Sequence, residues 1–563
     1  MFTIGTVATS FVRRLRRRAT LLRRAFNTAL LLTALPAAAA PNIIVVLTDD
    51  LNAEGAEQLI AEGYLPNIKN YVVDQGVSFR RAYVTNSECC PSRATLLTGR
   101  YAHNHGVLIN HALDPTKGGI GWPGWLSDGV NPGAESQTIA VWLRAAGYRT
   151  GYVGKYLNGY GDTAPPNVAD PRTYVPPGWD SWNALLAPTE YQVYDFDVNQ
   201  NGVPTRYSGT SNYQTDVLGT RAALFVRDSL ARNKPFFLVF APLAPHVEVN
   251  IDTFISGNST TGAFDMYIRP PPRHARLIDG DPSNGEFPFM PIKPSFNELD
   301  VTDKPSCPRS PPLPGPVVTS FPYCVQQRPV IGTLDQIARL NLQRKSMLTS
   351  VMAVDDVVGG LARSLESVGA LSNTVIIFMS DNGWFYGEHR LSSKELAYEE
   401  SIRIPLYIRS PGGRAGVVSN DLVINNDLAP TLAALGGVTA PYEMDGSSLE
   451  PLLSANPTSS WFNRRRFLVE RWYVPSLLKY DGPGYLALRA FDPTNNIDFT
   501  YIGTRADPSA PAQFTHQEMY DNTQDPYQLA SASLPSTVTT NLNNFLALFG
   551  VCRGAQCKAL ESF

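Results

Sequence analysis

The hydrophobic pattern of the chain contains short runs of consecutive apolar residues, many of them β-branched. Uninterrupted runs of this kind are typical of strands that are buried on both faces of a sheet. Segments with helical periodicity lie between them, and this alternation predicts an α/β fold with a mostly parallel sheet covered by helices on both faces. The predicted strands are residues 42–48, 150–154, 236–241, 374–380 and 405–408, and the predicted helices are residues 138–146, 216–231, 333–366 and 429–435.

The pattern changes twice along the chain. Residues from about 250 to 330 are dense in proline and poor in periodicity, which predicts a long insertion. After about residue 455 the apolar runs become short, and they predict a small antiparallel sheet with strands near residues 466–470, 485–490 and 499–503. We therefore expect a large domain over residues 41–455 and a C-terminal subdomain over residues 456–563.

Residues 1–40 have the composition of an export signal. They hold seven arginines and no lysine or acid, followed by an apolar core at 29–35, a proline and four alanines. The apolar core is too short for a stable transmembrane anchor, so we expect a secreted protein, extracellular or periplasmic, with no membrane span in the mature chain. Arg23 and Arg24 loosely resemble a twin-arginine signal.

Charge and cysteine content narrow the functional classes. Removing the seven arginines of the signal would take the net charge from −3 to −10, so nucleic acid is not expected as a partner. Six cysteines fit an oxidising compartment. By sequence spacing we pair Cys307 with Cys324 and Cys552 with Cys557, and we leave Cys89 and Cys90 as thiols. The single glycosylation sequon, at Asn258, predicts a glycoprotein if the host glycosylates.

One motif combines a cysteine with a helix start. Cys89 is followed two residues later by Pro91-Ser92-Arg93, and a short helical run then ends in Thr-Gly-Arg at residues 98–100. Proline suits the first turn of a helix, and helix N-termini favour anions. Arg93 lies one turn after Cys89, where its guanidinium could hold an oxyanion. The alternative is that Cys89 and Cys90 are small buried residues at an ordinary helix start.

The motif around Cys89 resembles the signature of the type I sulfatases, and the resemblance covers nearly all of residues 41–563. It implies an alkaline-phosphatase-like α/β fold, with residues 41–455 as the catalytic domain. In that family the first cysteine of the motif is oxidised by a formylglycine-generating enzyme to formylglycine, whose hydrate is the nucleophile. Cys89 is the matching position.

Oxygen ligands follow two of the predicted strands. Asp49 and Asp50 end the strand at 42–48, and Asp381 and Asn382 end the strand at 374–380. Such donors suit calcium or magnesium better than zinc. The resemblance implies that both pairs, together with the oxygen of the modified Cys89, bind one divalent cation, usually calcium. A single pair of this kind would otherwise be a solvated strand end.

Three further residues match basic positions of the family. The resemblance implies that Lys155 contacts the nucleophile or the sulfate, that His246 contacts the leaving-group oxygen, and that Lys394 binds sulfate. A histidine with an ordinary pKa is suited to proton transfer. Without the resemblance, a lone histidine would more often be structural and a lone lysine would be a solvated surface residue.

The segment after Lys155 departs from the commoner family pattern. Leu157 stands where many members carry a histidine, and the sequence from 154 to 158 looks more like that of N-acetylglucosamine-6-sulfatases. We expect Asn158 to act as the hydrogen bonder instead and His389 to line the substrate pocket. For the remaining histidines near the motif, His103, His105 and His111, we expect structural or rim positions.

The resemblance predicts an enzyme that releases inorganic sulfate from a small-molecule or carbohydrate sulfate ester, with aryl sulfates and sulfated sugars both open. Two alternatives remain at this point. One is a phosphonate monoester hydrolase or phosphodiesterase of the same superfamily. The other is a binding protein in which Cys89 is never modified.

Overall fold

The computed structural model describes most of the chain from residue 40 onward. The described residues are 40–110, 134–162, 168–249, 267–275, 293–305, 325–327, 330–457, 463–472, 484–505 and 513–562. Nearly all of the predicted export signal lies outside them, as do His111, Asn258, Cys307 and Cys324. Within the described residues, every helix is too short or too polar to span a lipid bilayer.

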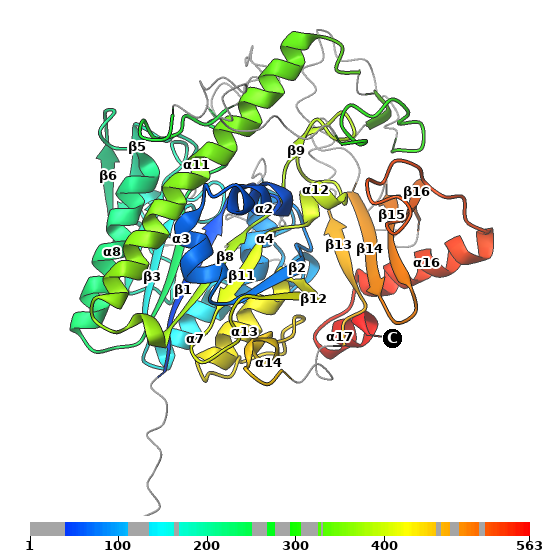
Figure 1. The fold of residues 1–563 in the computed structure, drawn as a ribbon. Helices are drawn as coiled ribbons and strands as arrows, with labels where there is room; N and C mark the ends of the chain where they lie inside the picture. The colour runs from blue at the N-terminus through cyan, green and yellow to red at the C-terminus, as the bar shows by residue number, and fades with distance from the viewer. Residues whose placement is uncertain are drawn as a thin grey trace, which may run out of the picture. The chain divides into compact units, whose positions relative to one another are not determined.

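Ten strands of the described residues form one sheet (Figure 1). In spatial order the strands are β12 (Val417–Ile424), β2 (Val77–Tyr83), β11 (Leu406–Arg409), β8 (Thr374–Ser380), β1 (Asn42–Thr48), β7 (Phe236–Ala241), β3 (Arg149–Gly154), β4 (Ser181–Leu185), β5 (Phe196–Gln200) and β6 (Val203–Tyr207). The pairs around the centre are parallel, whereas every pair that includes β11, β5 or β6 is antiparallel. The sheet is therefore mixed and mostly parallel, as predicted.

Helices cover both faces of this sheet. Ile43 and Val45 of β1 pack into one apolar core with residues of α4 (Cys89–Thr98), α7 (Ile139–Ala145) and α13 (Leu428–Leu435). The alternate residues Ile44 and Val46 pack into a second core with α2 (Ala53–Ala61), α8 (Gln214–Ala231) and α11 (Leu334–Glu366). Because successive strand residues point to opposite faces, a continuous apolar run is what such a strand requires.

The predicted helices lie close to their predicted bounds. The long helix α11 begins after Thr333, which forms a capping box: its hydroxyl accepts from the Gln336 amide at 3.1 Å, and the Gln336 side chain accepts from the Thr333 amide at 3.2 Å. The shorter elements are α3 (Pro66–Ile68), α5 (Ala102–His105), β9 (Phe385–Tyr386), β10 (Ser392–Ser393), α12 (Glu399–Ile402) and α14 (Glu450–Leu453).

A second sheet follows the first in the chain. Its four strands pair antiparallel in chain order: β13 (Arg466–Arg471), β14 (Gly484–Asp492), β15 (Ile497–Arg505) and β16 (His516–Asp521). Helix α16 (Ser536–Phe549) packs on β14 and β15, and α17 (Ala555–Glu561) follows near the C-terminus (Figure 1). The small antiparallel sheet is confirmed, and the domain boundary near residue 455 stays a prediction.

The described parts of the predicted insertion, residues 267–275, 293–305 and 325–327, hold one short 3-10 helix (Val325–Gln327) and no longer element. Cys552 and Cys557 form a disulfide, as predicted. Cys89 and Cys90 are buried thiols, also as predicted.

Candidate active site

The two predicted pairs of oxygen ligands lie side by side. Strands β1 and β8 are parallel neighbours with Thr48 opposite Ser380, so the residues that follow them leave the same edge of the sheet. Asp50 has a φ of 70°, a left-handed conformation that aspartate tolerates better than most residues. In this conformation its amide donates to Asp381 Oδ1 at 3.2 Å, which joins the two strand ends.

These strand ends form a buried acidic cluster. Carboxylate oxygens of Asp49, Asp50 and Asp381 lie within 4.8 Å of one another, and each of the three residues is at most 1% exposed. Burial raises the pKa of Asp381, and the negative charge of Asp49 adds to this rise. Burial likewise raises the pKa of Asp50, and nearby Lys394 offsets only part of the rise. A concentration of carboxylates this deep needs positive charge.

The donor set fits a cation that prefers oxygen ligands. Among the residues that the structure describes, Asp50 Oδ2 and Asn382 Oδ1 are buried acceptors without a hydrogen-bond partner. Such orphaned acceptors are costly unless a ligand satisfies them. The Cys89 thiol and the His246 imidazole also lie within 4.8 Å of an Asp49 oxygen. Most of the potential ligands are nevertheless carboxylate and amide oxygens, which calcium and magnesium prefer. The residues present therefore suit one such ion.

Cys89 points its thiol at this cluster. Helix α4 begins at Cys89, and the side chain is 1% exposed. Its Sγ lies 3.3 Å from Asp49 Oδ1, 2.8 Å from Lys394 Nζ and 3.5 Å from Lys155 Nζ. Burial and the neighbouring Asp49 raise the pKa of the thiol well above its ordinary value.

Three buried cations oppose the carboxylates. Lys155, which follows β3, places Nζ 2.5 Å from Asp49 Oδ2, and Lys394 pairs with Asp50 Oδ1. Arg93, one turn into α4, donates through Nε to Asp381 Oδ2 at 2.8 Å and lies 3.3 Å from Asp49 Oδ2 through Nη2. Burial alone would lower the pKa of both lysines, but the carboxylates outweigh it and leave each pKa raised. The lysines are therefore charged across the physiological pH range.

His246 lies at the same edge, after β7. Its Nδ1 donates to the Val247 carbonyl at 2.6 Å, and its Nε2 lies 3.5 Å from Asp50 Oδ2. Burial lowers the pKa of His246 to about 3 despite the nearby Asp49. The ring is thus neutral in the free protein, with a lone pair at Nε2.

Two aromatic residues that the sequence analysis missed flank the histidine. The centre of the Tyr191 ring lies 4.9 Å from that of the His246 ring, and Lys155 Nζ lies 4.6 Å from the centre of the Tyr191 ring. Trp384 lies 6.4 Å from His246 and 5.9 Å from Lys394 Nζ. Trp384 follows Asn382 by two residues, a proximity that could have identified it. Tyr191 lies between β4 and β5, where no pattern marks it.

Two predicted substrate-binding residues have other surroundings. The fully buried His389 places Nδ1 2.7 Å from Glu298 Oε2 and Nε2 3.8 Å from Glu400 Oε2. Asn158 donates its backbone amide to Cys90 Sγ at 2.8 Å, while its side-chain Oδ1 is buried and has no hydrogen-bond partner among the described residues. The cluster around Cys89 therefore forms without His389, and Asn158 reaches the neighbouring cysteine through its backbone.

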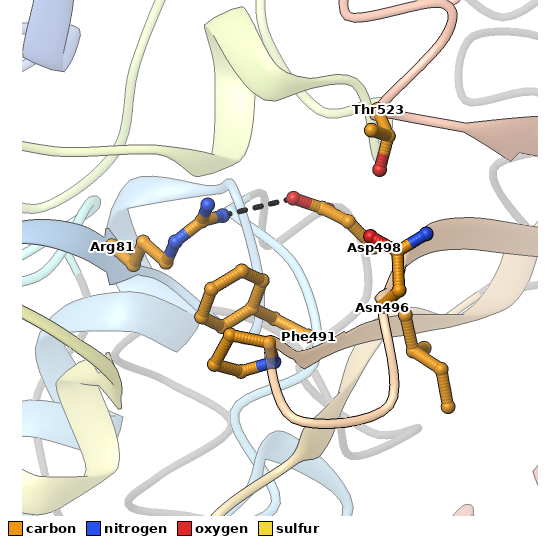
Figure 2. A pocket seen from close by; sticks show the side chains of 7 residues that line it. Arg81, Phe491, Asn496, Asp498 and Thr523 are labelled. Atoms are coloured by element: carbon orange, nitrogen blue, oxygen red, sulfur yellow. Dashed lines mark hydrogen bonds and ion pairs between the residues drawn. The ribbon is translucent and has the colours of Figure 1, made fainter.

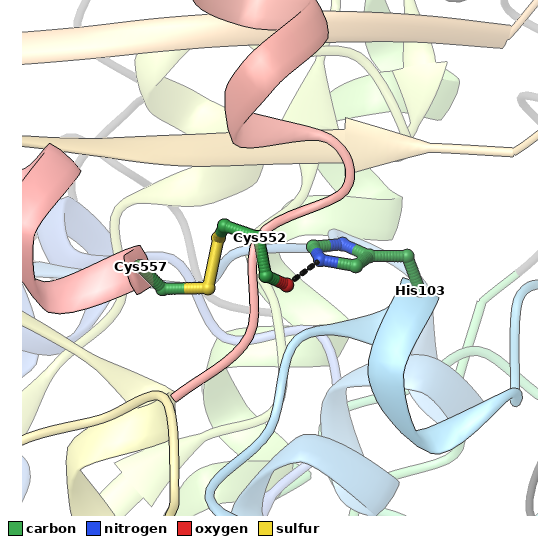
Figure 3. Close-up of side chains that lie close together, drawn as sticks. All are labelled: His103, Cys552 and Cys557. Atoms are coloured by element: carbon green, nitrogen blue, oxygen red, sulfur yellow. Dashed lines mark hydrogen bonds between the residues drawn. A yellow bond between two sulfur atoms is a disulfide. The ribbon is translucent and has the colours of Figure 1, made fainter. Parts of the chain in front are cut away.

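The histidines beyond α4 hold the fold together. His103 Nδ1 lies 2.7 Å from Glu470 Oε2, and its Nε2 lies 2.9 Å from the Cys552 carbonyl oxygen (Figure 3). The disulfide between Cys552 and Cys557 leaves no thiolate there for a metal. His105 Nε2 lies 3.0 Å from Thr95 Oγ1, and burial lowers the pKa of His105 to about 3.

A surface hollow of about 370 Å³ lies elsewhere, beside the second sheet. Figure 2 shows Arg81 reaching Asp498 across the ring of Phe491. Arg81 Nη1 lies 3.1 Å from Asp498 Oδ2. The guanidinium lies 3.4 Å from the ring centre. None of the residues around Cys89 lines this hollow.

Several known proteins are similar to this chain in sequence. The arylsulfatase of Volvox carteri is 29% identical over 551 residues, which cover 93% of this chain and 77% of the relative. The N-acetylglucosamine-6-sulfatase of Homo sapiens is 31% identical over 433 residues, which cover 76% of this chain and 67% of the relative. Both relatives have names that describe cleavage of sulfate esters.

A protein solved in complex with its substrate D-glucosamine-2-N,6-O-disulfate shares the fold, with a TM-score of 0.62 at 23% identity over 92% of this chain and 98% of that chain. The common fold is the alkaline-phosphatase-like one expected from the sequence. A model of the sulfatase family matches residues 41–438, well over half of the chain. The chain therefore belongs to the sulfatase family of enzymes, which hydrolyse sulfate esters.

Proposed function

We propose that this sulfatase cleaves aryl or carbohydrate sulfate esters with a hydrated formylglycine made from Cys89. The observation that carries the proposal is the position of the Cys89 thiol, 2.8 Å from Lys394 Nζ, 3.5 Å from Lys155 Nζ and 3.3 Å from Asp49 Oδ1. A structural cysteine would lie among apolar side chains, whereas this one lies among buried charges. A formylglycine-generating enzyme would be its partner during maturation.

Calcium is the metal that we propose, held by Asp49, Asp50, Asp381, Asn382 and an oxygen at position 89. The orphaned acceptors Asp50 Oδ2 and Asn382 Oδ1 support this assignment. When bound, the ion would offset the carboxylate charge and favour an oxyanion at position 89. A hydrated formylglycine would supply two hydroxyl groups on one carbon, one to attack sulfur and one to allow sulfate release, an exit that a serine or cysteine ester lacks.

The side chains of the chain itself then have distinct tasks. Lys155 and Lys394 place positive charge beside position 89, where they stabilise the attacking oxygen and the sulfate group. Arg93 holds Asp381 and Asp49 in place through its bonds to both. His246 is the residue that we assign to the leaving oxygen. Because its pKa is lowered to about 3, a proton at Nε2 requires the negative charge of a bound ester nearby.

The surroundings of His246 support a cyclic leaving group. Tyr191 and Trp384 place aromatic rings beside it, and such rings pack against aryl groups and against sugar faces. The relatives support the same classes, since one is named an arylsulfatase and another an N-acetylglucosamine-6-sulfatase. We also propose that the protein acts outside the cytoplasm, after removal of residues 1–40.

A turnover screen tests the proposal. Purified full-length protein, expressed with a formylglycine-generating enzyme, is assayed on aryl sulfates, sulfated monosaccharides and polysaccharides, and the matching phosphate and phosphonate esters. Intact-mass analysis of the peptide with residue 89 measures conversion of the cysteine. We expect conversion and a preference for sulfate. Faster turnover of phosphonates would favour the phosphonate monoester hydrolase, and a fully unconverted cysteine in protein from its native host would favour a binding protein.

Metal content is tested on the same preparation. We expect one alkaline-earth ion per chain and a rise in unfolding midpoint when calcium is returned to metal-stripped protein. At a hundredfold excess over the dissociation constant, the ion should stabilise the fold by about 2.7 kcal/mol. Asp50→Asn should lose most of this gain, whereas Asp445→Asn, a change at a buried acid outside the cluster, should keep it. Stoichiometric zinc would contradict the assignment.

A further inference from the structure

Two turns of the chain carry Cys89 and Lys394, whose side chains face each other at the candidate site. Glu88 is the N-cap residue of α4 and directly precedes Cys89, and Glu395 directly follows Lys394. Both acids are mostly buried, at 4% and 13% side-chain exposure. Their carboxylates belong to segments that lie more than 300 residues apart in the sequence.

One arginine of the second sheet lies between these acids. Arg471, the last residue of β13, has a side chain that is 2% exposed. Its Nε lies 3.0 Å from Glu88 Oε1, and its Nη2 lies 3.6 Å from Glu395 Oε2. A guanidinium is planar and always charged, so it can hold two carboxylates at a fixed separation.

Each acid connects Arg471 with a segment that carries a residue of the candidate site. Glu88 Oε2 accepts from the Asn110 amide at 2.9 Å, and Asn110 Oδ1 accepts from the Cys90 amide at 2.8 Å. These bonds fix the first turn of α4, where Cys89 lies. The backbone carbonyl of Glu395 accepts from the Tyr485 hydroxyl at 2.7 Å, a second contact from the same sheet.

The turn around Lys394 is strained, which makes this support necessary. Ser393 and Glu395 have φ angles of 116° and 89°, left-handed values that residues with a side chain rarely adopt. Strained backbone of this kind persists only where its surroundings fix it. The amide of Glu395 also donates to Ser401 Oγ at 3.0 Å, so its amide, carbonyl and side chain are all held.

We propose that Arg471 is a positioning residue: through Glu88 and Glu395 it sets the distance between position 89 and Lys394. The inference rests on the proposed function of Cys89 and deepens it, because it assigns the second sheet a part in catalysis. Misplacing a reacting group by about 1 Å can lower a rate about 100-fold. Loss of the arginine should therefore act on turnover more than on substrate binding.

The test compares two buried arginines of the same region. Arg464 lies just before β13 and is 5% exposed, and it pairs with Asp427 at 2.6 Å and with Glu561 at 2.8 Å, neither of which belongs to the two turns. We expect Arg471→Met to lower kcat per converted residue 89 by about 10- to 100-fold with little change in KM, and Arg471→Lys to recover part of the loss. Arg464→Met should lower the unfolding midpoint and keep the parent kcat.

Equal kcat per converted site in Arg471→Met and the parent would overturn the proposal. If Arg471→Met does not fold, Glu395→Gln is measured in its place, because this variant removes one charge and keeps the shape of the side chain. An unchanged kcat and pH profile in Glu395→Gln would also overturn the proposal. If the parent cleaves no sulfate ester, the proposed function fails independently of the role of Arg471. Hydrogen exchange then tests the positioning role without an activity assay. Faster exchange in residues 88–92 and 392–396 of Arg471→Met, but not of Arg464→Met, is expected, and equal exchange would refute the positioning role.

Discussion

At the scale of single residues, the candidate site balances its charges before any ligand binds. Among the described residues, three carboxylates face three cations in a volume that water hardly reaches. A divalent ion would leave this group with an excess of positive charge, which suits an anionic ester. The residues are Asp49, Asp50 and Asp381 against Arg93, Lys155 and Lys394.

The two adjacent cysteines should differ sharply in their effect on turnover. Cys89 faces Lys394 and Asp49, whereas Cys90 Sγ accepts the Asn158 amide, and burial raises the pKa of Cys90 to about 12. We expect Cys89→Ala to lose nearly all activity. Cys90→Ala should keep most of it and lose about 1 kcal/mol of stability, as for a small buried group. Steady-state kinetics and thermal unfolding measure both, and the reverse pattern would contradict the assignment of Cys89.

Asn158 offers a second test at this scale. Within the described parts of the chain its Oδ1 is a buried acceptor without a partner, which leaves it available for a hydrogen bond in the working site, while its backbone amide is already used by Cys90. Losing a preorganised hydrogen bond in an active site lowers rates by about 100- to 1,000-fold at the upper end, and we expect at least about tenfold for Asn158→Ala. The unfolding midpoint should change little. Turnover at the parent rate would show that Asn158 is only a turn residue.

At the scale of elements, contacts between α5 and β13 join the two sheets. Both ring nitrogens of His103 face acceptors: Nε2 faces the Cys552 carbonyl (Figure 3), and Nδ1 faces the Glu470 carboxylate. Only the imidazolium form donates to both. Burial lowers the pKa of His103, but Glu470 outweighs it and leaves the pKa raised. This contact therefore depends on a proton.

The contact predicts a pH dependence of stability. Because the pKa of His103 is raised in the folded state, its contribution is complete below the ordinary histidine pKa of about 6.5 and is lost as pH rises through the folded value. We expect the difference in unfolding free energy between the parent and His103→Gln to be largest near pH 6 and to shrink toward alkaline pH. Denaturant unfolding at several pH values measures it. A difference that stays constant with pH would show that His103 is neutral.

At the scale of the whole molecule, the central strands of the large sheet could be predicted from the sequence, and its edge strand β6 could not. Strands β1, β7 and β8 are buried on both faces, so their sequences are uninterrupted apolar runs. Strand β6 lies at the edge of the sheet with mostly polar, partly exposed residues, and no such run marks it. The order of the strands depends on pairings between distant segments, which local patterns do not contain.

The residues of the candidate site also differ in whether the sequence alone could predict them. Asp49, Asp50, Cys89 and their neighbours were predictable because each stands at a strand end or in a compact motif. Tyr191 and Arg471 were not, since each reaches the site from a distant segment through the tertiary fold. Residues that support a site from another element leave no local signal in the sequence.

Buried contacts cross the predicted boundary near residue 455. Arg464 lies beyond it and pairs with Asp427 at 2.6 Å, and the Tyr101 hydroxyl donates to Glu561 Oε1 at 2.8 Å, so buried polar groups before residue 455 depend on the C-terminal segment. Breaking one buried ion pair costs about 3–5 kcal/mol, and one unsatisfied buried hydroxyl costs about 1–3 kcal/mol. The apolar core is shared as well, since Phe467 packs 5.1 Å from the Tyr83 ring.

These losses approach the total stability of an ordinary domain, about 5–15 kcal/mol. We therefore expect a protein cut after residue 455 to be insoluble or unfolded, and residues 41–563 to unfold in one cooperative transition. Calorimetry of the longer protein and near-ultraviolet circular dichroism of the shorter one measure this. A soluble 41–455 protein with a cooperative transition would show that the second sheet is an independent domain, and Arg471 would then act from outside the catalytic fold.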